Sequence, residues 1–180
     1  MDIAKIEKLP RKFSGNAMPL QPESNHDDPN RLTLDRQLCF GLYAASHAMT
    51  KAYRPMLGKL GLTYPQYLVL MALWERNGQT VSELGAVLML DSGTLSPLLK
   101  RLEAAGLIRK LRLQTDERQV EISLTSHGLN LREASGRIRE KIVCLLGIND
   151  ADIAAMREKL NGLIVALNQH SQFRLKSAAE

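Results

Sequence analysis

Two cysteines carry the most reactive side chains of this chain, and they are Cys39 and Cys144. Cys39 lies in the stretch QLCFGLY, one helical turn before Tyr43. The thiolate is the nucleophilic form of cysteine, and phenol hydroxyls that donate to sulfur favour the thiolate over the thiol. Free cysteine is also among the most often buried residues, so inert packing is the alternative at both positions. The sequence therefore presents Cys39 as either a core residue or a reactive thiol.

The remaining candidate ligands do not form a metal-site pattern. The two cysteines are 105 positions apart, which excludes a CxxC site, and a permanent disulfide is not expected in a reducing cytosol. The histidines show no ligand spacing with each other or with the cysteines, and they are His26, His47, His127 and His170. We therefore expect no metal, no cofactor and no catalytic residues.

Composition limits the classes of protein. The chain has 180 residues, 44% of them hydrophobic and only 4% aromatic, which predicts one modest and mainly helical core. A net charge of +5 favours a polyanionic partner but does not by itself identify one. No segment has the length of a secretory signal's apolar run or of a membrane span, so we expect a cytoplasmic protein that does not enter a membrane.

Hydrophobic periodicity predicts two helices before the middle of the chain. Residues 1–31 hold four of the seven prolines and no apolar period, and we interpret them as a flexible arm. A long amphipathic helix is expected over 34–60, with Thr33 or Asp35 as its cap. A second helix is expected over 64–76, ended by Asn77 and Gly78.

The following segment predicts a helix-turn-helix. Thr80 and Glu83 form a capping box that opens a short helix through about Val87. Either Asp91 or Thr94 caps the next helix, which presents a leucine stripe on one side and ends at Gly106. Its other side carries small hydroxyls followed by cations. Such residues can contact base edges and phosphates, and the alternative is an ordinary solvated helix face. The candidate DNA-binding residues there are Ser92, Thr94, Ser96, Lys100 and Arg101.

A change to a period of two after Gly106 predicts a two-stranded ribbon, with Leu111 and Leu113 against the apolar residues of the second strand. Its expected tip, QTDER, presents Arg118, which has the reach and charge for a DNA minor groove. Asp116 is placed to orient this guanidinium by paired hydrogen bonds. A helix-turn-helix followed by a cationic hairpin is a winged helix.

The remaining helical stripes exceed what a small winged helix needs. We expect the fold class to be mainly α with a small β-hairpin wing, a winged helix-turn-helix domain over 32–170 and a C-terminal tail over 171–180. Its core is expected at about 62–125, and dimerisation helices are expected at about 34–60 and 126–170. Such a homodimer would place two recognition helices roughly 34 Å apart, in successive major grooves of double-stranded DNA.

The order of elements resembles the MarR type of bacterial transcriptional regulators. The motifs QLCFGLYAASHAMTKAYRP, LTYPQYLVL, LDSGTLSPLLKRLEAAG and DERQV resemble its organic-hydroperoxide-sensing branch, over about residues 34–168. The resemblance implies a homodimeric repressor in which peroxide oxidises Cys39. The supporting tyrosines of that branch match Tyr53 and Tyr64, with Tyr43 nearby, and the two-cysteine members resemble this chain at Cys144.

Helix geometry adds an independent argument about these tyrosines. Tyr53 follows Cys39 by fourteen residues, which returns it to nearly the same helix face but roughly 21 Å further along the axis. It cannot contact that thiol within its own chain. An antiparallel partner helix could bring its Tyr53 opposite Cys39, with Tyr64 close by, and the site would then lie across a two-fold interface.

The resulting hypothesis is a non-enzymatic repressor that binds operator DNA and takes organic hydroperoxide as its inducer. Oxidised Cys39 would form a disulfide with Cys144 of the other subunit, or a mixed disulfide with a small thiol. A repressor of the same fold gated by a phenolic or drug-like ligand is one alternative, in which Cys39 is incidental. A thiol peroxidase is the other, and it would leave the wing unexplained.

Overall fold

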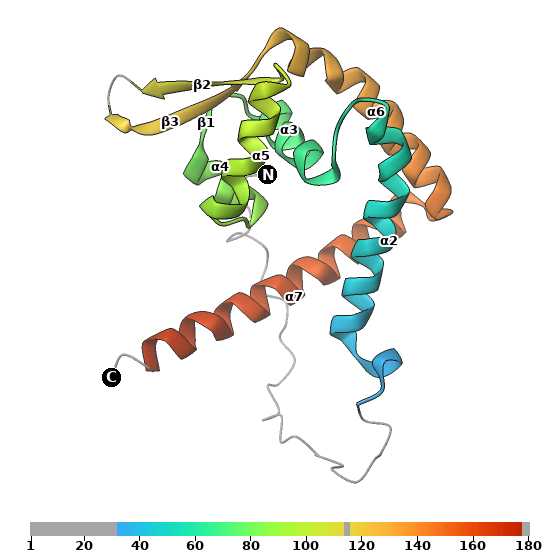
Figure 1. Cartoon of the computed structure of the whole chain (residues 1–180). Coiled ribbons are helices and arrows are strands. Elements are labelled where there is room, and N and C mark those ends of the chain that lie inside the picture. The colour runs from blue at the N-terminus through green and yellow to red at the C-terminus, as the bar shows by residue number, and fades with distance from the viewer. Residues whose placement is uncertain (1–31, 114–115, 178–180) are drawn as a thin grey trace. The chain divides into compact units, whose positions relative to one another are not determined.

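The computed structural model describes residues 32–113 and 116–177, and it describes side chains except at 112–119 and 170–177. The chain divides after Gly136 into two compact units, so α6 begins in the first and ends in the second. Figure 1 labels the elements along the chain. They are η1 (Leu34–Arg36), α2 (Leu38–Gly58), α3 (Tyr64–Glu75), β1 (Gln79–Thr80), α4 (Val81–Leu88), α5 (Ser92–Ala104), β2 (Ile108–Leu113), β3 (Asp116–Leu124), α6 (Ser126–Leu146) and α7 (Asp150–Ser177).

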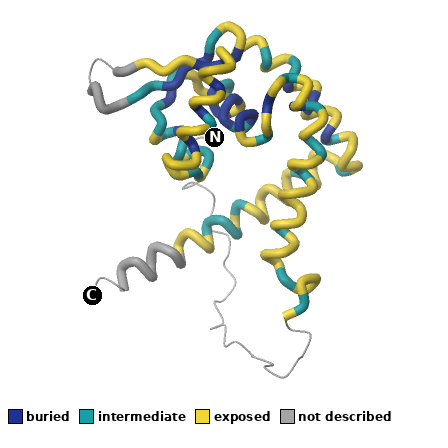
Figure 2. The backbone as a smooth tube through the Cα atoms, viewed as in Figure 1, coloured by how far each residue is buried: buried dark blue, intermediate teal, exposed yellow. Residues whose placement is uncertain are grey.

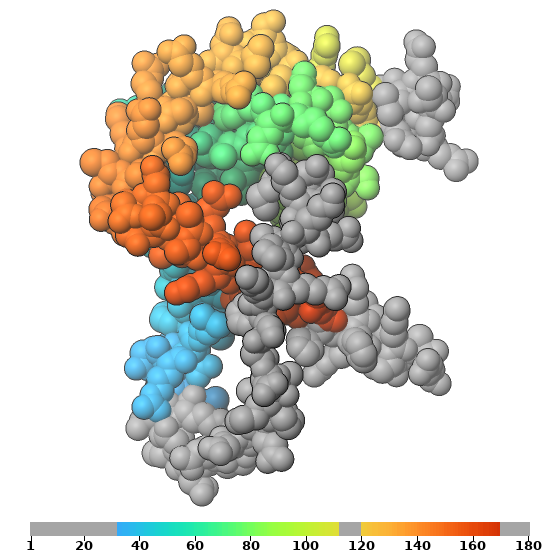
Figure 3. Space-filling view, turned by 180° about the vertical axis from the view of Figure 1, so that it is seen from behind, coloured from blue at the N-terminus to red at the C-terminus, as the bar shows by residue number. Residues whose placement is uncertain are grey.

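A single hydrophobic core holds the first unit together. Its fully buried apolar side chains come mainly from α3, α4, α5 and two strands, with Leu57 added by α2, and burial of each contributes about 1.5–3 kcal/mol. They include Val69, Leu70 and Leu73 of α3, Leu84 of α4, Leu95, Leu99 and Leu102 of α5, Ile108 of β2 and Ile122 of β3. Figure 2 shows these buried segments in α3, α5 and the sheet, whereas α2 is mostly exposed. In the space-filling view of Figure 3, the green and yellow segments of this unit form a continuous surface of side chains.

Two capped helices, α4 and α5, form the predicted helix-turn-helix. Thr80 Oγ1 accepts from the amide of Glu83 at 3.2 Å, and the Glu83 carboxylate accepts from the amide of Thr80 at 2.8 Å, which confirms the capping box. Of the two caps predicted for α5, the structure has Asp91. Pro97 therefore lies inside α5, where it removes one intrahelical hydrogen bond. The turn between the helices passes through Met89, whose φ of 55° is in the left-handed region.

The sheet differs from the prediction in two ways. It has three antiparallel strands in the order β1-β3-β2 rather than two, because Gln79 and Thr80, which follow α3, pair with β3. The register places Leu111 opposite Glu121, and Leu111 is 43% exposed. Directly opposed residues share one face of a sheet, so Ile108, which lies opposite Leu124, supplies the buried contact. The predicted packing of Leu111 against the apolar residues of β3 is therefore wrong.

The wing is the β2–β3 hairpin. Strand β3 begins at Asp116, which pairs with Leu113, and the register shifts before Arg112 pairs with Val120. Asp116 and Arg118 thus belong to the bulged start of a strand and not to a five-residue tip. Their side chains lie outside the part of the chain that the structure describes, so the predicted role of Arg118 stays a prediction.

Helix α2 starts later than predicted. The short η1 ends at Arg36, and Gln37 has extended backbone angles (φ −88°, ψ 118°) before α2 begins at Leu38. The apolar period continues through this break, so periodicity alone cannot locate it. As a result Cys39 is the second residue of α2 and lies in its first turn.

The second unit consists of the C-terminal part of α6 and all of α7. Gly147, with a φ of 64°, follows α6, and Asn149 caps α7 by accepting from the amide of Asp152 at 2.8 Å. Helix α7 continues to Ser177, within the segment predicted as a C-terminal tail. Among the described residues, no helix combines the length and apolar character that a bilayer crossing needs.

Candidate functional site

Cys39 lies where a helix favours negative charge. It is exposed, and it occupies the first turn of α2, whose N-cap residue Gln37 makes no side-chain capping hydrogen bond. The first turn of a helix carries the positive end of the macrodipole, and the effect is strongest there. The later start of α2 therefore puts Cys39 nearer to a helix N-terminus than a helix over 34–60 would, which supports a reactive thiol. Inert packing within this chain does not fit an exposed side chain.

Tyr53 and Tyr64 lie together, as predicted. Their ring centroids are 5.0 Å apart, which joins the C-terminal half of α2 to the start of α3. Burial raises the pKa of Tyr64, so its phenol stays protonated and keeps a proton to donate. Because α2 is continuous from Leu38 to Gly58, Cys39 stays roughly 21 Å along the axis from Tyr53 of the same chain. The structure therefore does not bring the thiol and these two phenols together within one protomer.

Two further aromatic residues extend the tyrosine pair, and the sequence reasoning missed them. Tyr67 contacts Tyr53 and Tyr64 with centroid distances of 5.8 and 6.4 Å, and Trp74 packs edge-on against Tyr67 at 6.1 Å. The Trp74 indole donates to the carbonyl oxygen of Gly128 at 2.9 Å. A spacing of three and then seven residues along α3 was the signal that could have found them. Through these rings, α2 and the start of α6 are both anchored on α3.

Tyr43 lies outside this aromatic cluster. It is 59% exposed, and its ring stacks on Phe40 at 6.4 Å and lies 4.3 Å from the His47 ring. Tyr43 follows Cys39 by one helical turn, so of the three predicted supporting phenols it is the nearest to the thiol along the same chain.

Cys144 lies near the end of α6, in the second unit, and is also exposed. The next two residues, Leu145 and Leu146, are 70% and 41% exposed. The packing role considered for Cys144 is therefore not fulfilled within a single chain. Exposed apolar residues grouped at a helix end are typical of an interaction surface.

The recognition helix α5 presents the predicted polar residues to solvent. Its buried side is formed by the leucine stripe, and the residues on its exposed side are Ser92, Thr94, Ser96, Lys100 and Arg101. Asp91, at the N-terminal end, accepts hydrogen bonds from both the amide and the hydroxyl of Thr94. Small hydroxyls followed by cations at an exposed helix start can read base edges and hold phosphates.

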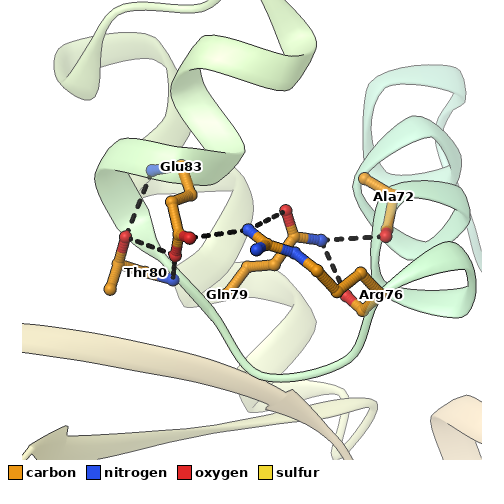
Figure 4. Close-up of polar contacts among 5 residues, drawn as sticks. All are labelled: Ala72, Arg76, Gln79, Thr80 and Glu83. Carbon is orange, nitrogen blue, oxygen red and sulfur yellow. Dashed lines mark hydrogen bonds and ion pairs between the residues drawn. The ribbon is translucent and has the colours of Figure 1, made fainter. Parts of the chain in front are cut away.

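A polar network fixes α4 to the end of α3 (Figure 4). The side-chain amide nitrogen (Nε2) of buried Gln79 donates to the carbonyl oxygens of Ala72 at 2.9 Å and Arg76 at 2.7 Å. These bonds supply donors to backbone carbonyl groups at the end of α3. Arg76 pairs with Glu83 at 2.7 Å. The amide of Thr80, its hydroxyl and then Arg76 hold the pKa of Glu83 at about 2. The helix-turn-helix is thereby tied to the helix that carries the aromatic cluster.

The described residues contain no group of three or more His, Cys, Asp and Glu side chains that could hold a metal ion. An open hollow of about 450 Å³ lies between α4, the start of α5 and β3, and Ser82, Gly85 and Ser92 are among its lining residues. It lies on the helix-turn-helix.

Comparison with known proteins places the chain among transcriptional regulators. Residues 51–134 match the family model described as transcriptional regulator SarA/Rot. Over 140 residues the chain is 46% identical to the organic hydroperoxide resistance transcriptional regulator of Bacillus subtilis, covering 78% of this chain and 95% of that protein. It is 56% identical over 110 residues to the regulator TtmR of Methylorubrum extorquens, covering 61% of this chain and only 55% of TtmR.

Solved structures give the same fold. AbfR of Staphylococcus epidermidis is 37% identical, with a TM-score of 0.64, over 76% of this chain and 94% of that one. AbfR has also been solved in reduced and overoxidised forms, each bound to DNA, and in a disulfide form. These likenesses confirm the predicted winged-helix fold.

Proposed function

Because the chain belongs to the family of MarR-type winged-helix transcriptional regulators that includes the organic hydroperoxide resistance regulator, we propose that it is a repressor that senses organic hydroperoxides through Cys39. The observation that carries the proposal is the position of Cys39, which is exposed in the first turn of α2. In reduced form the protein binds an operator in double-stranded DNA, and in oxidised form it releases it. Because operator DNA lies in the cytoplasm of a bacterial cell, the proposed function is a cytoplasmic one.

The functional form is a homodimer. Leu57 is the one α2 residue that is buried within the described chain, and none of the side chains at 150–169 in α7 is buried. Met156 and Leu160 of α7 are 55% and 38% exposed although they belong to an apolar stripe. Amphipathic helices with so little burial in the monomer bury their stripes against a second copy. An antiparallel pairing of α2 helices places Cys39 of one protomer beside Tyr53 and Tyr64 of the other.

Oxidation proceeds in two balanced steps. The Cys39 thiolate attacks one peroxide oxygen, the O–O bond breaks, the alcohol leaves, and the sulfur becomes sulfenic acid. The thiol of the partner subunit's Cys144 then attacks this sulfur, a disulfide forms, and water leaves. Cellular thiols reduce the disulfide and restore DNA binding.

A covalent bond is needed because the required change in stability is large. Moving a dimer from 99% to 1% binding-competent takes about 5.5 kcal/mol of differential stabilisation. A typical hydrogen bond contributes only about 0.5–1.5 kcal/mol. AbfR retains DNA in its overoxidised form, which favours a disulfide over the added charge of oxidised sulfur as the event that releases DNA.

Operator binding by wild-type and Cys39→Ser proteins, with and without cumene hydroperoxide at a fixed salt concentration, tests the proposal. We expect peroxide to release only the wild-type protein, and added thiols to restore its binding. A Cys39→Ser protein that still leaves DNA would support ligand gating instead.

The partner cysteine and the wing have their own tests. On a non-reducing gel after cumene hydroperoxide treatment, Cys144→Ser is expected to abolish the cross-linked dimer, and a cross-link that persists would contradict the Cys39–Cys144 pairing. A mixed disulfide with a small thiol would then be the alternative.

Arg118→Ala is expected to weaken DNA binding across all sequences, because a cation in the minor groove interacts mainly with the negative potential of the groove and the phosphates and not with particular bases.

We also propose that oxidation is a stoichiometric signal and not catalysis. Without added reductant, excess hydroperoxide is expected to oxidise each Cys39 thiol once, because the disulfide that forms is not reduced again. Multiple turnovers per minute with a physiological reductant would make the protein a thiol peroxidase.

A further inference from the structure

Asp91 and Thr94 form a closed pair at the N-terminal end of the recognition helix. Asp91 Oδ1 accepts from the backbone amide of Thr94 at 2.9 Å, and Asp91 Oδ2 accepts from the Thr94 hydroxyl at 2.8 Å. Both residues are exposed, so the pair lies on the surface that faces solvent in the free protein. The first of these bonds is an ordinary helix cap, whereas the second is not needed to cap the helix.

The second hydrogen bond determines what the Thr94 oxygen can do. A threonine hydroxyl has one proton to donate and two lone pairs that accept. The amide and then the hydroxyl of Thr94 lower the pKa of Asp91, so the carboxylate is ionised at neutral pH and can only accept. The hydroxyl proton of Thr94 is therefore directed at Asp91. What Thr94 presents outward is an acceptor oxygen and a methyl group.

This combination matches one of the base-pair edges in the major groove. An A·T pair presents the N6 amino group of adenine, which donates, and the C5-methyl group of thymine. Cytosine also offers an amino group, but a C·G pair has no methyl group. Guanine O6 and thymine O4 are acceptors, which an acceptor-only oxygen cannot satisfy.

We propose that Asp91 is a positioning residue for DNA specificity, which holds the Thr94 hydroxyl as an acceptor so that Thr94 reads an A·T base pair. The inference rests on the proposed function, in which α5 enters the major groove. Sequence reasoning assigned Thr94 to the reading surface but gave Asp91 no part beyond capping.

Asp91→Asn exchanges donor and acceptor between residue 91 and the Thr94 hydroxyl, and it keeps the helix cap. Asparagine caps helices about as well as aspartate. The Thr94 amide requires the asparagine oxygen as its acceptor, so the side-chain NH2 must face the Thr94 hydroxyl and donate to it. The hydroxyl proton then turns outward, and Thr94 becomes a donor toward DNA.

The test is selection of binding sites from a randomised duplex DNA library by the reduced proteins, followed by affinities for single base-pair variants of the selected site. We expect wild type to prefer A·T over G·C by about fivefold or more at one symmetric position, the lower end of what a base contact contributes. Asp91→Asn is expected to reduce that preference below about twofold or to reverse it. Overall affinity is not the readout, because removal of a negative charge beside phosphates strengthens binding to every sequence.

Two variants provide matched controls. Glu83→Gln makes the same carboxylate-to-amide change at the cap of α4, where it does not contact Thr94, and the base preference should be unchanged. Thr94→Ser keeps the acceptor but lacks the methyl group, so A·T and C·G pairs should become nearly equivalent at that position while G·C stays disfavoured.

The outcomes distinguish a failure of the proposed repressor function from a failure of the role proposed for Asp91. If wild type selects no sequence, the proposed repressor function is wrong. If wild type selects a defined site and Asp91→Asn has the same preference at every position, α5 reads DNA but Asp91 does not control how, and the inference is overturned.

Discussion

Replacing Glu83 by glutamine is expected to weaken the fold at neutral pH and to matter much less in acid. In the folded protein, hydrogen bonds from the Thr80 amide and hydroxyl, and then Arg76, lower the pKa of Glu83 from 4.5 to about 2. A pKa that is lower in the folded state means that folding favours the ionised carboxylate. This stability is fully present above about pH 4.5 and is lost as the pH falls through about 2.

The structure limits the size of the effect. At about 1.36 kcal/mol per pH unit, a fall from 4.5 to about 2 corresponds to at most about 3 kcal/mol. The side chains of Arg76 and Glu83 are 59% and 44% exposed, so water screens the charges and a contribution of about 1 kcal/mol is more realistic. We therefore expect Glu83→Gln to lower the free energy of unfolding by about 1 kcal/mol at pH 7, and by less than half of that at pH 3.

Urea unfolding followed by circular dichroism at pH 7 and pH 3 measures this difference, at one protein concentration because dimerisation contributes to stability. Glu133→Gln is the control, since it removes an exposed carboxylate of α6 for which the described residues show no ion pair. An equal loss at both pH values, or no loss at pH 7, would refute the assignment of the network as a charge-dependent link between α3 and α4.

Three further substitutions test other parts of the structure. Met89→Gly should raise the free energy of unfolding by about 1 kcal/mol, because glycine adopts the left-handed φ of 55° without strain; urea unfolding that shows destabilisation would contradict this. Gly128→Ala should cost about 2–3 kcal/mol, because the added Cβ would collide with the carbonyl of Leu107, and an unchanged midpoint would show that the α6 start can shift. Tyr64→Phe keeps the ring contacts but loses the hydroxyl, so oxidation of Cys39 by cumene hydroperoxide, followed by thiol alkylation, should slow by about tenfold.

Features set by local chemistry were predictable from the sequence. The capping box of Thr80 and Glu83 depends on two side chains three residues apart, and the structure contains it as predicted. The buried side of α5 follows from leucines spaced along one helix. The wing was predictable for the same reason, because a change of period from helix to strand is visible in the sequence itself.

Features set by contacts between distant segments were not predictable. Strand β1 exists because Gln79 pairs with Ile122, and two residues carry no periodic signal. The register of Leu111 depends on which residue of β3 it meets, and a slip of one residue exchanges the two faces of a strand. The aromatic cluster of α3 was only partly recognised, because the contacts of Tyr67 with Tyr53 join different helices.

In the proposed homodimer, Cys39 of each protomer receives hydrogen bonds from the phenols of Tyr53 and Tyr64 of the other protomer. Heterodimers purified with two affinity tags can test it, with peroxide oxidation of the remaining Cys39 thiol as the measured rate. One protomer carries Cys39→Ser, and its partner carries Tyr53→Phe and Tyr64→Phe, so the remaining thiol faces intact phenols across the interface. We expect this thiol to react at the wild-type rate, and to react slowly when all three substitutions are placed in one protomer beside a wild-type partner. The opposite pattern, with slow oxidation in the first heterodimer and normal oxidation in the second, would contradict a shared site.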